Sequence, residues 1–429
     1  MLQRVFSMQC ASSWSARWPI FSELRLSLRT VICVLGLFCA GISQAQTLIM
    51  VSIDGFRGDY LDIHQAPNIQ AIVDEGVRVK RLQPIYPPNT FPGHLSLITG
   101  LPPTEHGIVD NHFCDRQRGD CYHMGNGSKD SSWLKGMPLW NLAEAHGLVA
   151  ASYFWPESDA NWGGKHPTYT MHYAKSAPYA ERVAQVLNWL RLPEAVRPSL
   201  ITLYFSLVDT MGHRFGPLSM ETANAIAEVD GHIGTLWQGV KSLGLKDANI
   251  LLVSDHGMAQ IEGQYGIPES AFPEAVGFKR FVTNERVTYY AQSAEADVEG
   301  LRAELESYAD ERWTVYDTVQ LQALGDGSID LLPDLALITR PPAFFNKYGI
   351  GPETIEGSHG FPLDVPEMAA FAAAAGTAFK QGLVIEQAHQ LDVYPLAARV
   401  LGIAPLSELP SDGGALLQAL ALRSESTVD

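Results

Sequence analysis

The chain has 429 residues, with 30 Lys and Arg against 47 Asp and Glu, a formal net charge of −17 at pH 7 and five cysteines. Hydrophobic residues make up 46% of it, enough for a substantial core, which excludes a disordered protein. Binding a nucleic-acid polymer requires clustered Lys and Arg, so the acidic balance argues against a nucleic-acid-binding surface. Five cysteines in so long a chain exclude a disulfide-dense small scaffold.

Residues 1–45 are typical of a secretory signal peptide. The uncharged apolar run 31–42 is too short for a membrane span, Arg25 and Arg29 precede it, and Ser43-Gln44-Ala45 offers small residues for cleavage. We expect an exported chain, periplasmic or secreted, with no stable membrane span after cleavage; an uncleaved anchor helix is the alternative. Removing the leader's four arginines and one glutamate leaves 26 basic and 46 acidic side chains, a formal −20.

Cleavage would leave Cys114 and Cys121 as the remaining cysteines, both in a polar stretch. In an oxidising compartment we expect two thiols so close in sequence to form a disulfide, and two reduced thiols are the alternative. Because the closed loop is small, the bond would fix local geometry more than it would stabilise the whole protein.

The predicted elements alternate between strands and helices. In chain order, apolar runs predict strands and periodic patterns predict helices at 47–53 (strand), 67–75 and 91–100 (helices), 149–154 (strand), 178–190 (helix), 200–208 (strand), 219–243 (helix) and 250–254 (strand). The stretch 102–137 is polar and interrupted by glycines and prolines, so no regular structure is expected there. This alternation predicts an α/β fold with a mostly parallel central sheet flanked by helices.

Residues 258–350 differ from the rest in composition and pattern: they carry more charge, short strand-like pieces and a helix-like segment at 295–308. We interpret them as a smaller inserted cap. The catalytic core would then consist of residues 46–257 and 351–429. Its sheet is expected to bind ligands at the carboxyl ends of its parallel strands.

Acidic residues follow three predicted strands at that edge: Asp54, Asp209 and Asp255, the last beside His256. Three carboxylates in one place repel one another unless a positive charge neutralises them. His213 would share a helical face with Asp209, and His359 lies between glycines. Asp and neutral His together suit zinc, and six such ligands predict a two-metal hydrolytic site.

Thr90 supplies a candidate nucleophile. It precedes an apolar helical pattern, so the simplest interpretation is a helix cap. A hydroxyl at a helix N-terminus also lies where free N–H groups and the helix dipole favour a phosphate. A metal contacting that oxygen would lower its pKa, and both roles are compatible with one residue.

Seven motifs occur together in this chain: Asp54, Pro-Asn-Thr90-Phe-Pro-Gly-His, Thr-Glu-His106-Gly-Ile-Val-Asp-Asn111, Phe154-Trp-Pro, Asp209-Thr-Met-Gly-His213, Ser254-Asp-His256-Gly-Met and Gly357-Ser-His359-Gly. In this set and order they resemble the nucleotide pyrophosphatase/phosphodiesterase family of the alkaline phosphatase superfamily, over about residues 47–405. Gly93 departs from the Asn associated with that motif position; the position is not that of a ligand, so the departure concerns local packing. The resemblance implies an alkaline phosphatase-like fold and an exported, bacterial-type member.

The resemblance also implies site roles and two zinc ions per chain. One ion would be held by Asp54, Thr90, Asp255 and His256, and the other by Asp209, His213 and His359. Thr90 would form the covalent intermediate, and Asn111 with the Thr90 backbone N–H would hold a phosphate oxygen. The expected substrate-binding residues are Asn111 and three aromatic residues, Phe91, Tyr173 and Tyr204, that would form a stacking slot for a base, with ordinary core packing as the alternative. The resemblance itself places Phe91 and Tyr173 around the nucleoside, whereas Tyr204 lies in a buried-strand pattern.

The sequence therefore predicts a zinc phosphodiesterase or nucleotide pyrophosphatase that acts on a small molecule and releases nucleoside 5′-monophosphate. A lysophospholipase C-like or choline phosphodiesterase of the same family is the main alternative. A binding protein with a vestigial site, or another hydrolase of the superfamily, fits less well. The oligomeric state is open, with a monomer slightly favoured.

Overall fold

The structure is a computed structural model that describes residues 46–308, 310–325, 329–346 and 355–421. The predicted signal peptide at 1–45 lies outside these residues. Within the described part of the chain, no helix is both long enough and apolar enough to cross a membrane.

An eight-stranded sheet in the order β18-β2-β17-β8-β1-β7-β5-β6 organises the fold. Its strands, in chain order, are β1 (Thr47–Ile53), β2 (Val77–Gln83), β5 (Ala150–Tyr153), β6 (Tyr169–Met171), β7 (Leu200–Phe205), β8 (Ala248–Val253), β17 (Ala370–Gly376) and β18 (Leu383–His389). All neighbouring pairs are parallel except the two that β17 makes with β2 and β8. The predicted α/β class with a mostly parallel sheet is confirmed.

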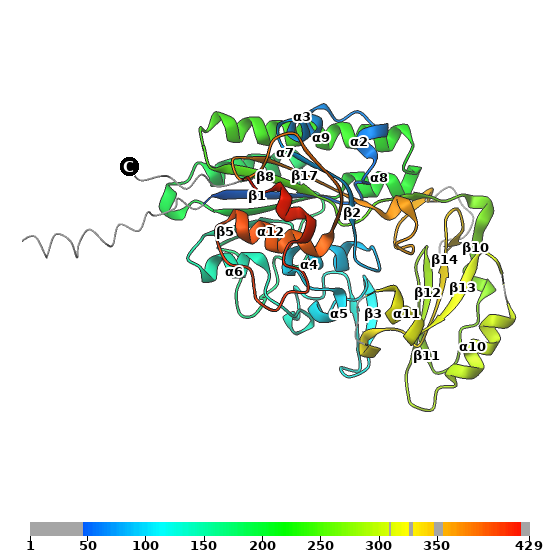
Figure 1. Ribbon diagram of the computed structural model, residues 1–429. Coiled ribbons are helices and arrows are strands. Elements are labelled where there is room, and N and C mark those ends of the chain that lie inside the picture. The colour runs from blue at the N-terminus through cyan, green and yellow to red at the C-terminus, as the bar shows by residue number, and fades with distance from the viewer. Residues whose placement is uncertain (1–45, 309, 326–328, 347–354, 422–429) are drawn as a thin grey trace, which may run out of the picture. The chain divides into compact units, whose positions relative to one another are not determined.

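Helices cover both faces of this sheet (Figure 1). On one face lie α3 (Pro67–Glu75), α7 (Tyr179–Leu190) and α9 (Met220–Ser242), and on the other α4 (Thr90–Thr99), α6 (Leu139–Ala145) and α12 (Val393–Val400). β1 shows why: Leu48 and Met50 pack into one hydrophobic cluster, and Ile49, Val51 and Ile53 into the other. A strand buried on both faces is apolar at every position, which explains the continuous hydrophobic run.

Two predictions of secondary structure were wrong. The strand expected at 200–208 ends at Phe205, and residues 207–208 already belong to α8 (Leu207–Phe215). The stretch expected to be irregular, 102–137, contains α5 (Pro103–His106) and a hairpin of β3 (His112–Asp115) and β4 (Asp120–His123). The hairpin strands are too short to show period-2 alternation, and cross-strand pairing holds them in register.

A separate four-stranded antiparallel sheet lies within the range assigned to the inserted cap. Its order is β11 (Phe278–Val282), β12 (Arg286–Ala291), β14 (Leu335–Thr339) and β13 (Trp313–Asp317). With α10 (Val298–Ser307) it encloses its own hydrophobic cluster, and α11 (Thr318–Leu324) lies beside β13. The boundaries at 258 and 350 stay a prediction, because residues 347–354 lie outside the described part.

Several short elements complete the fold. α2 (Tyr60–Ile63) follows β1, β10 (Gly266–Pro268) pairs with β15 (Phe344–Asn346), and β9 (Ala259–Gln260) pairs with β16 (Gly357–Ser358). The last pair matters for the site, because it fixes the segment that carries His359 beside the segment that follows β8.

Candidate active site

The carboxyl ends of β7, β1 and β8 bring the predicted acidic residues together. β1 lies between the other two strands in parallel register, with Ile53 opposite Phe205 and Ser52 opposite Val253. The segments that leave the three strands therefore start side by side at one edge, as expected for parallel strands. They carry Asp54, Asp209 and Asp255.

Gly55 permits this close approach. Its backbone has φ +67°, a left-handed conformation that favours glycine, and its N–H donates to Asp255 Oδ1 at 3.1 Å. A Cβ at this position would lie 3.0 Å from both the Cα and the Cβ of Asp209. The glycine thus lets β1 turn between two carboxylates.

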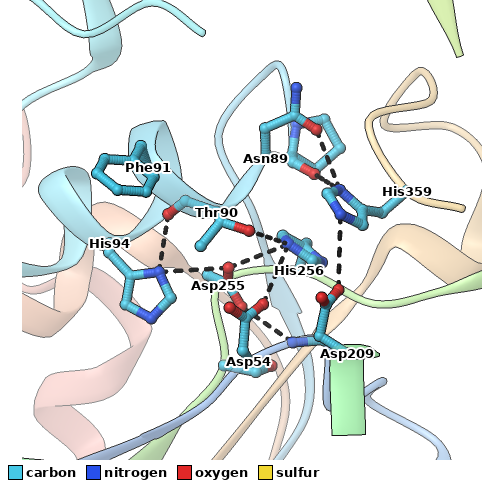
Figure 2. Close-up of polar contacts among 12 residues, drawn as sticks. Asp54, Asn89, Thr90, Phe91, His94, Asp209, Asp255, His256 and His359 are labelled. Atoms are coloured by element: carbon cyan, nitrogen blue, oxygen red, sulfur yellow. Dashed lines mark hydrogen bonds and ion pairs between the residues drawn. The ribbon is translucent and has the colours of Figure 1, made fainter. Parts of the chain in front are cut away.

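The predicted histidines complete the cluster. Asp209 and His213 lie one turn apart on α8, with His213 Nε2 3.4 Å from Asp209 Oδ1. His359 Nε2 is 3.6 Å from the same oxygen. His256 Nε2 is 3.0 Å from Asp255 Oδ2 and 3.5 Å from Asp54 Oδ1 (Figure 2).

Hydrogen bonds determine which nitrogen of each imidazole faces the carboxylates. Nδ1 of His213 meets the carbonyl oxygen of Gly357, and Nδ1 of His256 meets that of Gly257, each at 2.9 Å. Nδ1 of His359 is 3.0 Å from the Pro88 carbonyl oxygen. A carbonyl oxygen only accepts, so each Nδ1 is the donor and each Nε2 carries a lone pair in the neutral ring.

Lone pairs therefore face lone pairs, which is the arrangement that a bound cation requires. Among the described residues, Asp54 Oδ1, Asp209 Oδ1 and Asp255 Oδ2 are buried and form no hydrogen bond. Two groups have ligand atoms within 4.8 Å of one another: Asp54, Asp255 and His256, and Asp209, His256 and His359. Carboxylate oxygens and imidazole nitrogens fit divalent metals such as zinc, with the outer ring nitrogens held by carbonyl groups.

The electrostatics of the cluster agree with this interpretation. Burial, followed by the charges of Asp255 and Asp209, raises the pKa of Asp54 well above its usual value. Burial and the neighbouring rings of His256 and His213 lower the pKa of His359 well below its usual value. Burial opposes charge on His256 too, but Asp255 outweighs it and raises the pKa of that ring. A bound cation would remove the repulsion between the carboxylates.

Thr90 lies at the edge of this cluster, as predicted. It is the first residue of α4, and its Oγ1 is 3.4 Å from His256 Nε2. Asn89, not Thr90, occupies the helix cap position. Asn111 Oδ1 accepts the Phe91 backbone N–H at 3.0 Å, so the Nδ2 group of Asn111 is its donor end. A hydroxyl, a helix N-terminus and an amide donor thus adjoin the ligand cluster.

The comparisons with known proteins agree with this geometry. A family model described as "Type I phosphodiesterase / nucleotide pyrophosphatase" matches residues 48–362. The chain belongs to this family. The structure, with its mostly parallel sheet, resembles murine ectonucleotide pyrophosphatase/phosphodiesterase 5 with a TM-score of 0.78 and 25% identity, covering 88% of this chain and all of that one.

Relatives from animals are similar over most of this phosphodiesterase-family chain. Ectonucleotide pyrophosphatase/phosphodiesterase family member 3 of Rattus norvegicus is 32% identical over 387 residues, which are 85% of this chain and 43% of the relative. Venom phosphodiesterase of Naja atra is 30% identical over 392 residues, which are 86% of this chain and 46% of the relative. The chain thus spans less than half the length of these relatives.

The family motif around Thr90 contains two residues whose roles the sequence did not reveal. His94 donates from Nδ1 to the Thr90 carbonyl oxygen at 2.7 Å, accepts from Ser52 Oγ at 2.7 Å and lies 3.3 Å from Asp255 Oδ2. Asn89 Oδ1 accepts from His359 Nδ1 at 3.0 Å. Both side chains are buried; His94 lies within the apolar helix α4, and Asn89 is the cap residue just before it. The available signal was a polar residue in or beside an apolar helical pattern.

The predicted base-stacking residues differ in their surroundings. Phe91 is half-buried, with its ring 6.4 Å from that of Tyr122. Tyr173 is 53% exposed and contacts the Phe154 ring edge to face. Tyr204 is buried, and its hydroxyl donates to Asp54 Oδ2. Phe91 and Tyr173 thus keep accessible ring surface, whereas the geometry of Tyr204 suits orienting Asp54.

The predicted disulfide joins Cys114 and Cys121. These residues are directly opposite each other in the β3–β4 hairpin, and not in an irregular loop. The hairpin follows Asn111 directly, and Tyr122 on β4 contacts Phe91. The bond therefore fixes an element beside the candidate substrate slot.

Proposed function

We propose that this chain is a two-zinc phosphodiesterase that hydrolyses nucleotide phosphodiester or pyrophosphate bonds through a covalent Thr90 intermediate. The observation that carries the proposal is the position of Thr90 Oγ1, at the N-terminus of α4 and 3.4 Å from His256 Nε2 in a buried Asp and His cluster. The printed names of the relatives, nucleotide pyrophosphatase and phosphodiesterase, support the same reaction.

The residues that would hold the metals fall into two sets. Asp54, Asp255 and His256 with Thr90 would hold one ion, and Asp209, His213 and His359 the other. When bound, the two zinc ions would supply four positive charges against three carboxylates, stabilising the anionic phosphate and the alkoxide of Thr90. The net acidity of the chain is therefore compatible with an anionic substrate.

The chain's own residues would carry out the substitution at phosphorus. Thr90 Oγ1 gives up its proton to solvent and attacks phosphorus in line. The bond from phosphorus to the leaving oxygen breaks, and the leaving group departs with that oxygen and the bonding electron pair. The Asn111 amide, fixed by the Phe91 N–H, donates to a non-bridging oxygen together with the Thr90 backbone N–H. Water then cleaves the Thr90–phosphorus bond, which restores the hydroxyl and releases nucleoside 5′-monophosphate.

The engagement of two arginines by other protein groups supports a singly charged phosphate group in the substrate. Arg182 donates to the Tyr204 backbone carbonyl at 2.8 Å, and Arg286 lies 3.4 Å from Asp110. Neither guanidinium has an ion pair or hydrogen bond with Thr90 among the described contacts. A monoanionic diester or pyrophosphate group therefore suits the site better than a dianionic monoester. We propose a small nucleotide as substrate and an exported, periplasmic or secreted location.

Hydrolysis of a nitrophenyl nucleotide ester by the wild type and by Thr90→Ala tests the mechanism. The alanine variant should retain bound zinc and lose turnover by at least about 10³-fold, since the nucleophile is absent. Thr90→Ser should recover part of the rate. Equal rates for the wild type and Thr90→Ala would rule out the proposed intermediate.

Substrate class is tested with Phe91→Ala. Loss of stacking should reduce turnover of the nucleotide ester by about 10-fold or more and leave bis(nitrophenyl) phosphate nearly unaffected. A uniform loss across the nucleotide ester, bis(nitrophenyl) phosphate and nitrophenyl phosphocholine would favour the choline phosphodiesterase alternative instead.

A further inference from the structure

A buried ion pair connects the four-stranded sheet to the candidate site. Arg286, the first residue of β12, places Nη1 3.4 Å from Asp110 Oδ2, and its Nε lies 3.4 Å from Glu285 Oε1. The side chains of Arg286 and Asp110 are 8% and 6% exposed. Arg286 Nη2 is buried and has no hydrogen-bond partner among the residues that the structure describes. A buried guanidinium is costly unless paired, so Asp110 is its principal compensation on the core side.

The second oxygen of Asp110 organises two residues of the site. Asp110 Oδ1 accepts from Asn89 Nδ2 at 2.9 Å and from the Asn111 backbone N–H at 2.7 Å. A carboxylate only accepts, so it fixes Asn89 with its amide nitrogen toward Asp110 and its oxygen toward His359. That oxygen accepts from His359 Nδ1, which leaves Nε2 with the lone pair that faces Asp209.

The same carboxylate also positions Asn111. By accepting the Asn111 N–H, Asp110 fixes the backbone from which the Asn111 side chain reaches the Phe91 N–H. Gly360 packs at this junction, where a Cβ would lie 2.7 Å from both Asn89 Oδ1 and the Glu285 side chain. One buried carboxylate thus links a candidate metal ligand, a candidate phosphate donor and the separate sheet.

We propose that Arg286 and Asp110 are positioning residues for the reaction. Arg286 holds Asp110, and Asp110 sets the orientation of Asn89 and the position of Asn111. Through Asn89 it supplies the second acceptor at His359 Nδ1, beside the Pro88 carbonyl oxygen. The four-stranded sheet is therefore part of the catalytic apparatus through this contact. This inference rests on the function proposed above, because it assigns roles around Thr90 and the metal ligands.

Four variants test the proposal: Arg286→Met, Arg286→Lys, Asp110→Asn and the double variant Arg286→Met/Asp110→Asn. The control is Arg302→Met, which breaks an arginine–carboxylate pair with Asp317 (2.7 Å) in the same four-stranded region. Turnover of the nitrophenyl nucleotide ester, the zinc dissociation constant and the melting temperature are measured for each. Thr90→Ala is run in parallel, so that a failure of the proposed reaction is distinguished from a failure of this inference.

Arg286→Met should lower kcat by about 10- to 100-fold and weaken zinc binding by about 10-fold, the range seen when residues that orient metal ligands are removed. KM should change less than kcat, and Arg286→Lys should recover part of the loss. Because both residues act through one contact, the double variant should lose less than the product of the single losses.

Any of three results overturns the proposal. One is that Arg286→Met and Asp110→Asn keep kcat and zinc affinity within about twofold of Arg302→Met. The second is that the two losses multiply in the double variant, and the third is that they simply follow the melting temperature. If the wild type shows no turnover at all, the zinc dissociation constants decide alone, because the orientation of His359 does not depend on the substrate.

Discussion

Tyr204→Phe distinguishes a base-stacking role from an orienting role, because it keeps the ring and removes only the hydroxyl. That hydroxyl donates to Asp54 Oδ2, and both side chains are buried. The other oxygen of Asp54, Oδ1, has no hydrogen bond. The variant would therefore leave both oxygens of the buried Asp54 carboxylate without a hydrogen-bond donor.

The size of the effect follows from this geometry. A hydrogen bond to a charged acceptor contributes about 1.5–3 kcal/mol, and 1.4 kcal/mol is about tenfold in an equilibrium constant. We expect metal binding in Tyr204→Phe to weaken by about 10- to 100-fold, with a loss of kcat at limiting metal. Saturating metal should restore most of the activity, and the KM for the nucleotide ester should stay close to the wild-type value.

The deficit should depend on pH. Burial and the neighbouring carboxylates raise the pKa of Asp54, and the Tyr204 hydrogen bond opposes that shift by favouring the charged form. Its removal raises the pKa further, so protons compete more strongly with the metal. The ratio of zinc dissociation constants between Tyr204→Phe and wild type should therefore grow as the pH falls from 8 to 6.

Competition against a chromophoric chelator measures these constants. Tyr179→Phe is the matched control, since it removes a hydroxyl that hydrogen-bonds to the neutral Ser206 at 3.2 Å. Unchanged zinc affinity in Tyr204→Phe at every pH would refute the orienting role. A raised KM with normal metal binding would instead support the substrate-binding role predicted from the sequence.

Other perturbations test other parts of the structure. Chelation of the metals should lower the melting temperature, because it leaves three buried carboxylate oxygens facing one another, and zinc should restore it; calorimetry that detects no change would contradict the metal site. Gly93→Ala would place a Cβ 3.0 Å from Asp255 Cβ, so zinc binding should weaken by about tenfold with little loss of stability, as chelator competition would show. Burial lowers the pKa of His106 to about 3, whereas an unfolded histidine titrates near 6.5. The unfolded state then binds the extra proton, so His106 reduces stability by about 1.4 kcal/mol per unit of falling pH, and His106→Gln should flatten that slope in chemical unfolding between pH 6 and 4.

Local patterns in the sequence were sufficient for the sheet and for most of the ligand set. The apolar run of β1 ends at Asp54 and that of β8 just before Asp255, so parallel strands alone place both at one edge. The spacing of Asp209 and His213 needed only one helical turn, which α8 provides. The hairpin around Cys114 and Cys121 was missed, because four-residue strands carry too little periodicity.

Only the tertiary structure decided what the buried polar side chains do. Tyr204 lies in an apolar strand whose pattern predicts burial and says nothing about its partner, and that partner is Asp54, 150 residues away. In the sequence, His94 looks like an ordinary helix residue and Asn89 like a residue that precedes a helix. Only folding brings Asp255 beside His94 and His359 beside Asn89. Arg286, on the four-stranded sheet, pairs with Asp110, which lies in the loop before β3. Periodicity is a property of neighbouring residues along the chain, whereas the orientation of a ligand depends on hydrogen bonds between segments that meet only after folding.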